Sequence, residues 1–220
     1  MSFLNMRSKI AVFGAGGLGR EIPCIINKIN EIETLWDFIG FFDDGIEIGT
    51  EVDGHLILGG LSELNAWSEE LSIVFGIASP KIVKKIVGDI TNKLIDFPNI
   101  ISPDFYWLDK NSFNIGKGNF INFRCTASIN VNIGDFNSIG AFTSLGHDSK
   151  IGNFNTIMPS VQVCGHVVIE EENFLGISSI ILQGNHIGKD VTLGAGSILM
   201  KDAQDDLTYF GNPARPIIKK

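Results

Sequence analysis

Aliphatic residues recur at every sixth position through the second half of the chain. Counting in sixes from Ile115 to Leu199 meets fifteen aliphatic residues without an insertion. Glycine often follows the aliphatic residue, which argues against an α-helix because each interior glycine would cost about 1 kcal/mol. The fifteen positions are Ile115, Ile121, Ala127, Ile133, Ile139, Leu145, Ile151, Ile157, Val163, Ile169, Leu175, Ile181, Ile187, Leu193 and Leu199. The pattern predicts a parallel β-helix in which each hexad forms one short strand and one corner.

A second period of eighteen residues accompanies the first. The similar segments IGKGNF, IGDFNS, IGNFNT and IEEENF begin at positions 115, 133, 151 and 169. Three hexads are therefore expected to form one triangular coil, and fifteen hexads to form five coils. Parallel strands stack about 4.8 Å apart, so this prism would be roughly 24 Å tall. The spacing by itself carries no information about handedness.

The N-terminal third shows a different pattern, in which apolar runs alternate with helical segments. Strands are predicted at residues 10–13, 38–42 and 73–77, and helices at residues 20–29 and 80–93. Pro23 is expected in the first turn of the first helix, and Ser79 and Pro80 at the start of the second. Strand–helix–strand alternation predicts a parallel sheet with right-handed crossovers, which binds ligands at the carboxyl ends of its strands.

A glycine-rich loop, Gly14-Ala-Gly16-Gly-Leu-Gly19, directly follows the first predicted strand. Bare backbone at such a loop lets a phosphate approach the N-terminus of the next helix. Asp43 and Asp44 follow the second strand, where a carboxylate can accept hydrogen bonds from a ribose or a base edge. We interpret this region as a nucleotide site rather than as a plain tight turn. Only one half of a dinucleotide fold fits before Ile115, which favours a mononucleotide-linked ligand over NAD.

The two patterns divide the chain into two expected domains. Residues 1–98 are predicted to form a Rossmann-like α/β half-domain that binds a nucleotide sugar, and residues 99–220 to form the β-helix with a C-terminal tail. Residues 96–114 are interpreted as a segment that connects the α/β unit to the first coil.

Composition and charge narrow the classes of function. The 220 residues carry 17 Lys and Arg against 25 Asp and Glu, a net charge of −8, which argues against a nucleic-acid partner. No stretch approaches about 18 uninterrupted apolar residues, so no membrane span is predicted. Three widely spaced cysteines predict neither a disulfide framework nor a zinc site. The first apolar run is interpreted as a buried strand rather than a signal peptide, so a cytoplasmic location is expected.

Short motifs along nearly the whole chain resemble those of one family. They are Gly14-Ala-Gly-Gly-Leu-Gly19, Gly40-Phe-Phe-Asp43-Asp44, Leu58-Gly59-Gly60, Gly146-His147-Asp148, Ile151-Gly152-Asn153-Phe154, Cys164-Gly165, Phe174-Leu175-Gly176, Leu193-Gly194-Ala195-Gly196 and Gly211-Asn212-Pro213-Ala214. In this order they resemble the hexapeptide-repeat sugar acyltransferases of bacterial surface-glycan pathways, especially the UDP-amino-sugar N-acetyltransferases and the sialic acid O-acetyltransferases. The resemblance implies a left-handed β-helix, a homotrimer, and acetyl-CoA in the groove between neighbouring helices.

The resemblance also implies a set of site residues. His147 would be the general base, Asp148 would raise its basicity, and the N–H of Gly165 would bind the thioester oxygen. The positions implied to contact acetyl-CoA are Thr156, Gly165, Ile177 and Ala195. The positions implied to line the sugar-nucleotide pocket are Gly16, Gly17, Leu18, Asp43, Asp44 and Ala78.

Three positions depart from the pattern of the family. Thr156 stands where the family has a histidine on the CoA side, Ser102 where many relatives carry histidine, and Ala78 where glycine is usual. These changes leave the prediction of acetyl transfer intact and bear on the identity of the acceptor and on the affinity for the acyl-CoA.

The repeat itself predicts that His147 and Gly165 lie together. The two positions are eighteen residues apart, so stacked coils place them within about 5 Å along the axis. Acetyl transfer from a thioester needs a base and an oxyanion donor in such an arrangement. Neighbouring strand residues point to opposite faces, so Asp148 can orient His147 only at a bent corner. His166 and His186 fall in other columns, which argues against a three-histidine metal site.

These features predict an acetyl-CoA-dependent N-acetyltransferase that acts on a nucleotide-linked amino sugar in bacterial surface-glycan biosynthesis, by direct transfer and without a metal. The alternatives are an O-acetyltransferase acting on sialic acid or a related sugar, and a non-catalytic scaffold that binds sugar nucleotides. Phe142, Val167 and Ile177 are expected to point outward from the prism. Exposed apolar groups of this kind predict an interface between copies, as in a homotrimer.

Overall fold

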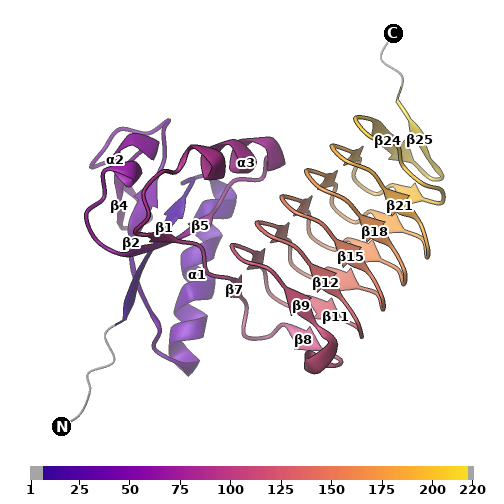
Figure 1. The fold of residues 1–220 in the computed structure, drawn as a ribbon, viewed down its shortest axis with the longest axis horizontal. Helices are drawn as coiled ribbons and strands as arrows, with labels where there is room; N and C mark the ends of the chain where they lie inside the picture. Colours follow the sequence, from indigo (N-terminus) through magenta and orange to yellow (C-terminus); the bar gives the residue numbers. More distant parts are fainter. Residues whose placement is uncertain (1–6, 218–220) are drawn as a thin grey trace.

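The computed structural model describes residues 7–217, which form two parts packed side by side (Figure 1). The first part is an α/β unit and the second is a prism of short strands stacked in coils. Within residues 7–217, no helix is both long and apolar enough to cross a membrane.

A single sheet in the order β3-β4-β2-β1-β5-β6 forms the centre of the α/β unit. Its strands are β1 (Ser8–Phe13), β2 (Trp36–Phe42), β3 (Glu51–Val52), β4 (His55–Gly59), β5 (Leu71–Phe75) and β6 (Ile95–Asp96), and its helices are α1 (Gly17–Ile32), α2 (Leu61–Asn65) and α3 (Pro80–Asp89). Successive side chains of β1 point to opposite faces, so Ile10 packs with α1 and Phe13 packs in the layer of α2 and α3. All neighbours are parallel except β3 and β4, which form an edge hairpin.

Several details of the α/β unit differ from the expectation. The first helix begins at Gly17, three residues earlier than predicted, so Pro23 lies inside the helix rather than in its first turn. The helix that starts at Pro80 ends at Asp89 instead of continuing to residue 93. Strands β3, β4 and β6 and helix α2 were not predicted, because they are short and show no clear periodicity.

The prism has three faces, each formed by stacked strands, and each corner is named by the two faces it joins. Face 1 holds β7 (Ile100–Ile101), β10 (Phe120–Ile121), β13 (Ser138–Ile139), β16 (Thr156–Ile157), β19 (Phe174–Leu175), β22 (Thr192–Leu193), β24 (Thr208–Gly211) and β25 (Ala214–Pro216). Face 2 holds β8 (Tyr106–Trp107), β11 (Thr126–Ala127), β14 (Ser144–Leu145), β17 (Gln162–Val163), β20 (Ile180–Ile181) and β23 (Ile198–Leu199). Face 3 holds β9 (Asn114–Ile115), β12 (Asn132–Ile133), β15 (Lys150–Ile151), β18 (Val168–Ile169) and β21 (His186–Ile187). Except for the terminal β25, which is antiparallel to β24, neighbouring strands are parallel.

The prism begins one coil earlier than expected, so the interpretation of residues 96–114 as a connecting segment is wrong. β7 pairs with β10 through Ile100 and Phe120, and β8 pairs with β11. This first coil contains the short 3-10 helix η1 (Lys110–Ser112) between β8 and β9. The extra residues break the six-residue spacing between Trp107 and Ile115, which is why counting in sixes stops at Ile115.

The aliphatic residues of the hexads fill the axis of the prism. From Ile121 to Leu199, each of them is at most 4% exposed. Val167 is fully buried as well, which corrects the expectation that it points outward. The preceding residue, His166, has a φ of 58°, and this left-handed turn directs the next side chain into the axis. Phe142 and Ile177 are 47% and 48% exposed and do point outward.

Asparagines form a buried ladder at corner 3/1. The members are Asn119, Asn137, Asn155 and Asn173, none more than 2% exposed. In each of them the side-chain oxygen accepts the backbone N–H of the residue one coil further on. Asn137 Nδ2 also donates to Asn119 Oδ1 at 3.0 Å, and Asn155 repeats this bond to Asn137. The ladder thus satisfies polar groups that the close stacking removes from water.

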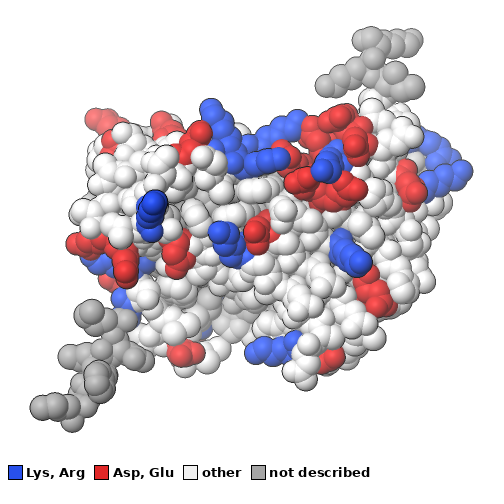
Figure 2. Space-filling view, viewed as in Figure 1, with Lys and Arg blue, Asp and Glu red and all other residues white. Residues whose placement is uncertain are grey.

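The α/β unit covers face 1 of the prism from one corner to the other. Phe120 of face 1 is buried in the layer of α1. At corner 3/1, Lys81 Nζ of α3 lies 2.5 Å from Asp190 Oδ2. Basic and acidic side chains gather at the top of the same view, over α3 and the coils beside it (Figure 2). At corner 1/2, Asn122 Nδ2 donates to Glu21 Oε2 of α1 at 3.1 Å. Corner 2/3 therefore lies on the opposite side of the prism from the α/β unit.

Candidate active site

His147 and Asp148 lie at corner 2/3, between β14 and β15. Asp148 has a φ of 59°, the left-handed backbone that bends the chain at the corner. The bend brings two consecutive side chains together, so His147 Nδ1 lies 2.8 Å from Asp148 Oδ2. The bent corner on which the predicted pairing depends is present. Both side chains are partly exposed, at 44% for His147 and 34% for Asp148, so a solute can reach them.

The imidazole of His147 lies against Gly165 of the next coil. A methyl group on Gly165 would sit 2.4 Å from His147 Nε2, so only glycine leaves room for the ring in this position. The Gly165 N–H donates no hydrogen bond to any residue within 7–217. The eighteen-residue spacing had predicted this contact. His147 Nε2 and the Gly165 N–H, which has no hydrogen-bond partner among the described residues, therefore lie close together.

Asp148 is held as an ionised carboxylate. The hydrogen bond from His147, followed by the one from Asn130, lowers the pKa of Asp148 below its ordinary value. Asn130 Nδ2 donates to Asp148 Oδ1 at 3.0 Å. An ionised carboxylate can only accept, so in the neutral imidazole the proton lies on Nδ1 and the lone pair on Nε2. The nitrogen beside Gly165 is thus the one that can take up a proton.

His166 also contacts this pair, which the sequence analysis missed. Its ring lies edge-on to that of His147, with centroids 4.9 Å apart. His166 Nε2 is 3.7 Å from Asp148 Oδ2. The signal was available, because position 166 is eighteen residues after Asp148. His186 lies away from this cluster on face 3, where it pairs with Glu170, so the three histidines do not converge. The absence of a metal stays a prediction.

The glycine-rich loop joins β1 to α1 at the carboxyl end of the sheet. A methyl group on Gly19 would lie 1.8 Å from the carbonyl oxygen of Gly14, so this close approach requires glycine. Gly16 and Gly17 are exposed and have open space around them. Their backbone, at the start of α1, is accessible to a phosphate. Leu18 instead packs against the apolar core beneath α1.

Both carboxylates that follow β2 are engaged by backbone groups. Asp43 Oδ2 accepts the Ala15 N–H at 2.9 Å, and Asp43 Oδ1 accepts the Gly45 N–H at 2.8 Å. Asp44 Oδ1 accepts the Leu61 N–H at 2.7 Å, at the start of α2. Asp43 therefore holds the glycine-rich loop against the end of β2. The sequence analysis had assigned it only a role toward the ligand.

Ala78 opens onto a cleft between α3 and face 1 of the prism. The residues that line this cleft are Ala78, Ser79, Pro80, Lys81, Glu172, Phe174, Asp190 and Thr192. Ala78 follows β5, whose carboxyl end lies at the same edge of the sheet as the glycine-rich loop. The loop, Asp43 and Ala78 are thus gathered at one edge of the sheet, where the carboxyl ends of β1, β2 and β5 lie.

The positions predicted to contact acetyl-CoA are spread over the prism. Thr156 lies on face 1, only 4% exposed, in the contact with the α/β unit. Ile177 and Ala195 are both exposed and stack in one column at corner 1/2. Gly165 lies at corner 2/3. A single chain therefore does not bring these four positions together.

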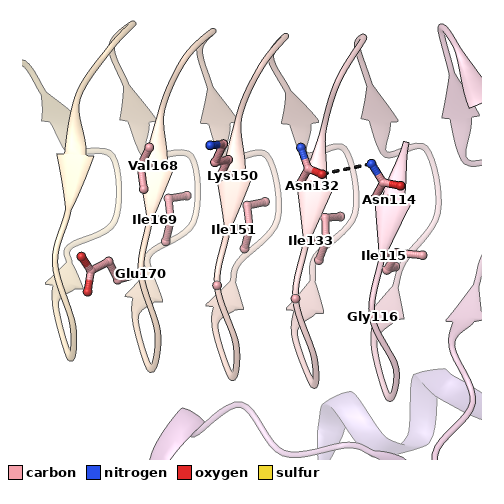
Figure 3. A pocket seen from close by; sticks show the side chains of 12 residues that line it. Asn114, Ile115, Gly116, Asn132, Ile133, Lys150, Ile151, Val168, Ile169 and Glu170 are labelled. Carbon is pink, nitrogen blue, oxygen red and sulfur yellow. Dashed lines mark hydrogen bonds between the residues drawn. The ribbon is translucent and has the colours of Figure 1, made fainter. Parts of the chain in front are cut away.

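Face 3 carries a shallow hollow that the sequence analysis did not predict (Figure 3). Asn114, Asn132, Lys150 and Val168 project from successive strands, and Glu170 lies at one end. Asn114 Nδ2 donates to Asn132 Oδ1 at 3.0 Å. Lys150 lies two residues after Asp148, so the hollow borders the corner that carries His147.

The three cysteines differ in how deeply they are buried. Burial raises the pKa of Cys125 to about 11, which keeps this thiol protonated and unreactive near neutral pH. Cys24 is exposed on α1, and Cys164 is half-buried beside Gly165.

Comparisons with known proteins agree with this architecture. The model of the PglD N-terminal domain matches residues 9–90. GDP-perosamine N-acetyltransferase from Escherichia coli O157:H7 is 31% identical over 210 residues, which is 93% of this chain and 94% of that protein. The acetyltransferase domain of PglB from Neisseria gonorrhoeae FA1090, in complex with acetyl coenzyme A, is 27% identical with a TM-score of 0.85, covering 96% of this chain and all of that one. WeeI from Acinetobacter baumannii AYE is 25% identical with a TM-score of 0.86, covering 96% of this chain and all of that one.

The fold and these relatives define an acyltransferase with an α/β half-domain ahead of a left-handed parallel β-helix, as predicted. More narrowly, the chain belongs to the family of hexapeptide-repeat sugar acetyltransferases that includes GDP-perosamine N-acetyltransferase.

Proposed function

We propose that this protein transfers the acetyl group of acetyl-CoA to the amino group of a nucleotide-linked sugar. The observation that carries the proposal is the pairing of His147 with Asp148 directly beside the uncommitted N–H of Gly165. A related structure of the same fold contains acetyl-CoA, and the relative from Escherichia coli is named for an amino-sugar substrate.

The reaction follows from the chemistry of the corner. The nitrogen of the sugar amine attacks the thioester carbonyl, and His147 Nε2 removes a proton from that amine. Asp148 keeps the Nδ1 proton oriented and stabilises the imidazolium that forms. The N–H of Gly165 stabilises the oxyanion of the tetrahedral intermediate. When that intermediate collapses, the C–S bond breaks, the imidazolium returns its proton to the sulfur, and CoA leaves as the thiol.

The α/β unit would hold the nucleotide sugar. Gly16 and Gly17 would present backbone to the diphosphate, and Leu18, Asp43, Asp44 and Ala78 would complete the pocket. Because both oxygens of Asp43 already accept N–H groups, we assign it chiefly to the shape of the loop. The cleft beside Ala78 would then accommodate the sugar between α3 and face 1.

We infer that the working site is formed by two copies of the chain in a homotrimer. The nucleotide pocket faces face 1, whereas His147 lies at the opposite corner, so one chain cannot place both on one substrate. Thr156, Ile177 and Ala195, proposed to contact acetyl-CoA, also lie away from corner 2/3. Exposed apolar residues on face 2 and its two corners support an interface there, namely Tyr106, Leu108, Ile129, Phe142, Ile177, Leu182 and Met200. A patch of this kind marks an interface more often than bare solvent-facing surface.

Release of free thiol from acetyl-CoA, measured with a panel of acceptors, tests the proposal. The panel contains nucleotide-linked amino sugars, their hydroxyl counterparts and sialic acid. Release only with amines is expected. Release only with hydroxyl sugars would instead indicate an O-acetyltransferase, and no release with any acceptor would indicate a binding protein.

Light scattering tests the assembly. A mass of three chains is expected, because the acceptor and the base come from different copies. A monomer with full activity would contradict the shared site.

A further inference from the structure

One carboxylate oxygen at corner 2/3 faces two imidazoles. Asp148 Oδ2 lies 2.8 Å from His147 Nδ1 and 3.7 Å from His166 Nε2. The other oxygen, Oδ1, is already occupied by Asn130. The His166 side chain is 57% exposed, so it can exchange protons with water and turn toward Asp148. The mechanism above leaves His166 without a role.

We propose that His166 is a positioning residue for acetyl transfer, which competes with His147 for Asp148 and thereby extends the activity of His147 to lower pH. The inference rests on the proposed function, because it takes His147 as the base. His166 acts through Asp148 and through its charge, and it needs no contact with the substrate.

The competition follows from the count of charges. Asp148 supplies one negative charge, which can compensate one imidazolium but not two. Once His166 takes up a proton, a second proton on His147 is opposed by a like charge whose ring centre is 4.9 Å away. A proton on one ring therefore opposes a proton on the other, and this opposition is the physical basis of the proposed effect on activity.

Within one chain, few ionisable groups face His166. The coil below contributes His147 and Asp148, the two ionisable groups that contact it. The coil above carries Gln183 and Gly184 at the same corner, and neither ionises. On its own corner the remaining titratable group is Cys164, which is half-buried.

The dependence of kcat/KM on pH tests the inference in the full-length enzyme, with EDTA present throughout. In His166→Gln the acid limb of the profile should move to higher pH by about 0.6 units, the effect of a unit charge about 5 Å away in a dielectric close to that of water. Above the limb, kcat/KM should stay within about threefold of wild type. His186→Gln is the matched control, because His186 also pairs with a carboxylate, at 2.9 Å, but has no second imidazole beside it. Its profile should coincide with that of wild type.

Titration of the His147 ring proton by NMR, without substrates, provides a readout that does not depend on turnover. The midpoint for His147 should rise in His166→Gln and stay unchanged in His186→Gln. An unchanged midpoint in His166→Gln, or an equal loss of rate at every pH, would overturn the inference. A shifted NMR titration with an unshifted rate profile would show that His147 is not the base, and would overturn the proposed function together with the role proposed for His166.

Discussion

Two short histidine–carboxylate hydrogen bonds lie on the described part of the prism, and they differ in what surrounds them. His147 and Asp148 meet at 2.8 Å at corner 2/3, and His186 and Glu170 meet at 2.9 Å on face 3. The side chains of His147 and His186 are also equally accessible, at 44% and 45%. Distance and exposure therefore do not separate the two pairs.

The difference lies in the neighbours. His147 stands against a glycine whose N–H is uncommitted, and its carboxylate is fixed by Asn130 and approached by His166. His186 is a strand residue of face 3 whose own N–H is bonded to Asp202, and no second imidazole accompanies it. An ion pair that only stabilises the stacking of two coils requires no further groups around it. A base for acyl transfer also needs an adjacent oxyanion donor, and the Gly165 N–H is the proposed donor beside His147.

The largest expected effect separates the two histidines directly. His147→Ala should lower the rate of the chemical step by roughly 10²–10⁴-fold, the usual contribution of a positioned base. His186→Ala should remain within about threefold of wild type, because its ring is not part of the proposed site. Single-turnover kinetics with acetyl-CoA in excess measures both. Turnover close to wild type in His147→Ala would refute the mechanism.

The contact with glycine can be broken without removing either histidine. Gly165→Ala places a methyl group where it would lie 2.4 Å from His147 Nε2, so the ring must move. A displacement of about 1 Å can cost up to 10²-fold in rate, so a loss of about 10- to 100-fold is expected. Because the His147 ring is partly exposed, it can rotate outward, and the variant should still fold. Circular dichroism of the variant should therefore match that of wild type. Gly88→Ala, which meets no neighbouring atom, is the control and should keep full activity. An unchanged rate in Gly165→Ala would contradict the placement of the base.

A substitution in the α/β unit tests whether the nucleotide sugar and acetyl-CoA bind to different parts of the molecule. Asp43→Ala removes the carboxylate that holds Ala15 and Gly45, so the glycine-rich loop should loosen. Binding of the nucleotide sugar should weaken by about tenfold, the equivalent of about 1.4 kcal/mol, while binding of acetyl-CoA stays unchanged. Titration calorimetry with each ligand decides this. An equal loss of both affinities would indicate that the variant disturbs the whole molecule.

The carboxylates of the two pairs should also differ in their effect on rate. Asp148→Asn should lower the rate by about tenfold, less than the loss of His147, because Asp148 only orients and tunes the ring. A neighbouring carboxylate favours imidazolium, so its removal should move the acid limb of the rate profile to lower pH. Glu170→Gln should leave the profile in place. A profile that moves to higher pH in Asp148→Asn would reverse the assigned role.

The smallest effect concerns stability. The pKa of Asp148 is lower in the folded chain than its ordinary value, so its ionisation stabilises the fold at neutral pH. This contribution is fully present above the ordinary carboxyl pKa and is lost as the pH falls through the depressed value. Asp148→Asn should therefore be slightly less stable than wild type at pH 7, and the gap in Tm should close toward pH 3. A gap of constant size across this range would show that the hydrogen bonds, rather than the charge, are responsible.

Regular stacking is the reason that so much of the prism could be predicted. Each coil repeats the one below it, so adding eighteen to a residue number gives its neighbour. This arithmetic alone places His147 against Gly165, and the same addition from Asp148 reaches His166. The addition of eighteen fails where η1 interrupts the repeat between Trp107 and Ile115. For this reason the first coil was not predicted from the sequence.

The α/β unit was less predictable because its contacts follow no period. The strands and helices with strong signals were placed to within a few residues, and β3, β4, β6 and α2 were missed. The role of Asp43 toward Ala15 depends on how β2 ends beside the loop after β1, twenty-eight residues away along the chain. Hydrogen bonds of this kind are set by the pairing of strands, which the order of residues alone does not display.

Counting along the sequence predicted five stacked coils, the inward direction of the hexad aliphatic residues and the meeting of His147 with Gly165, because in-register parallel stacking is a local rule repeated without change. Only the tertiary structure decided which face of the prism the α/β unit covers. Phe120 and the ion pair of Lys81 with Asp190 make that choice through contacts between distant segments. The covered face leaves His147 on the far side of the prism from the proposed nucleotide pocket, and that geometry is the reason we assign the proposed reaction to two copies of the chain.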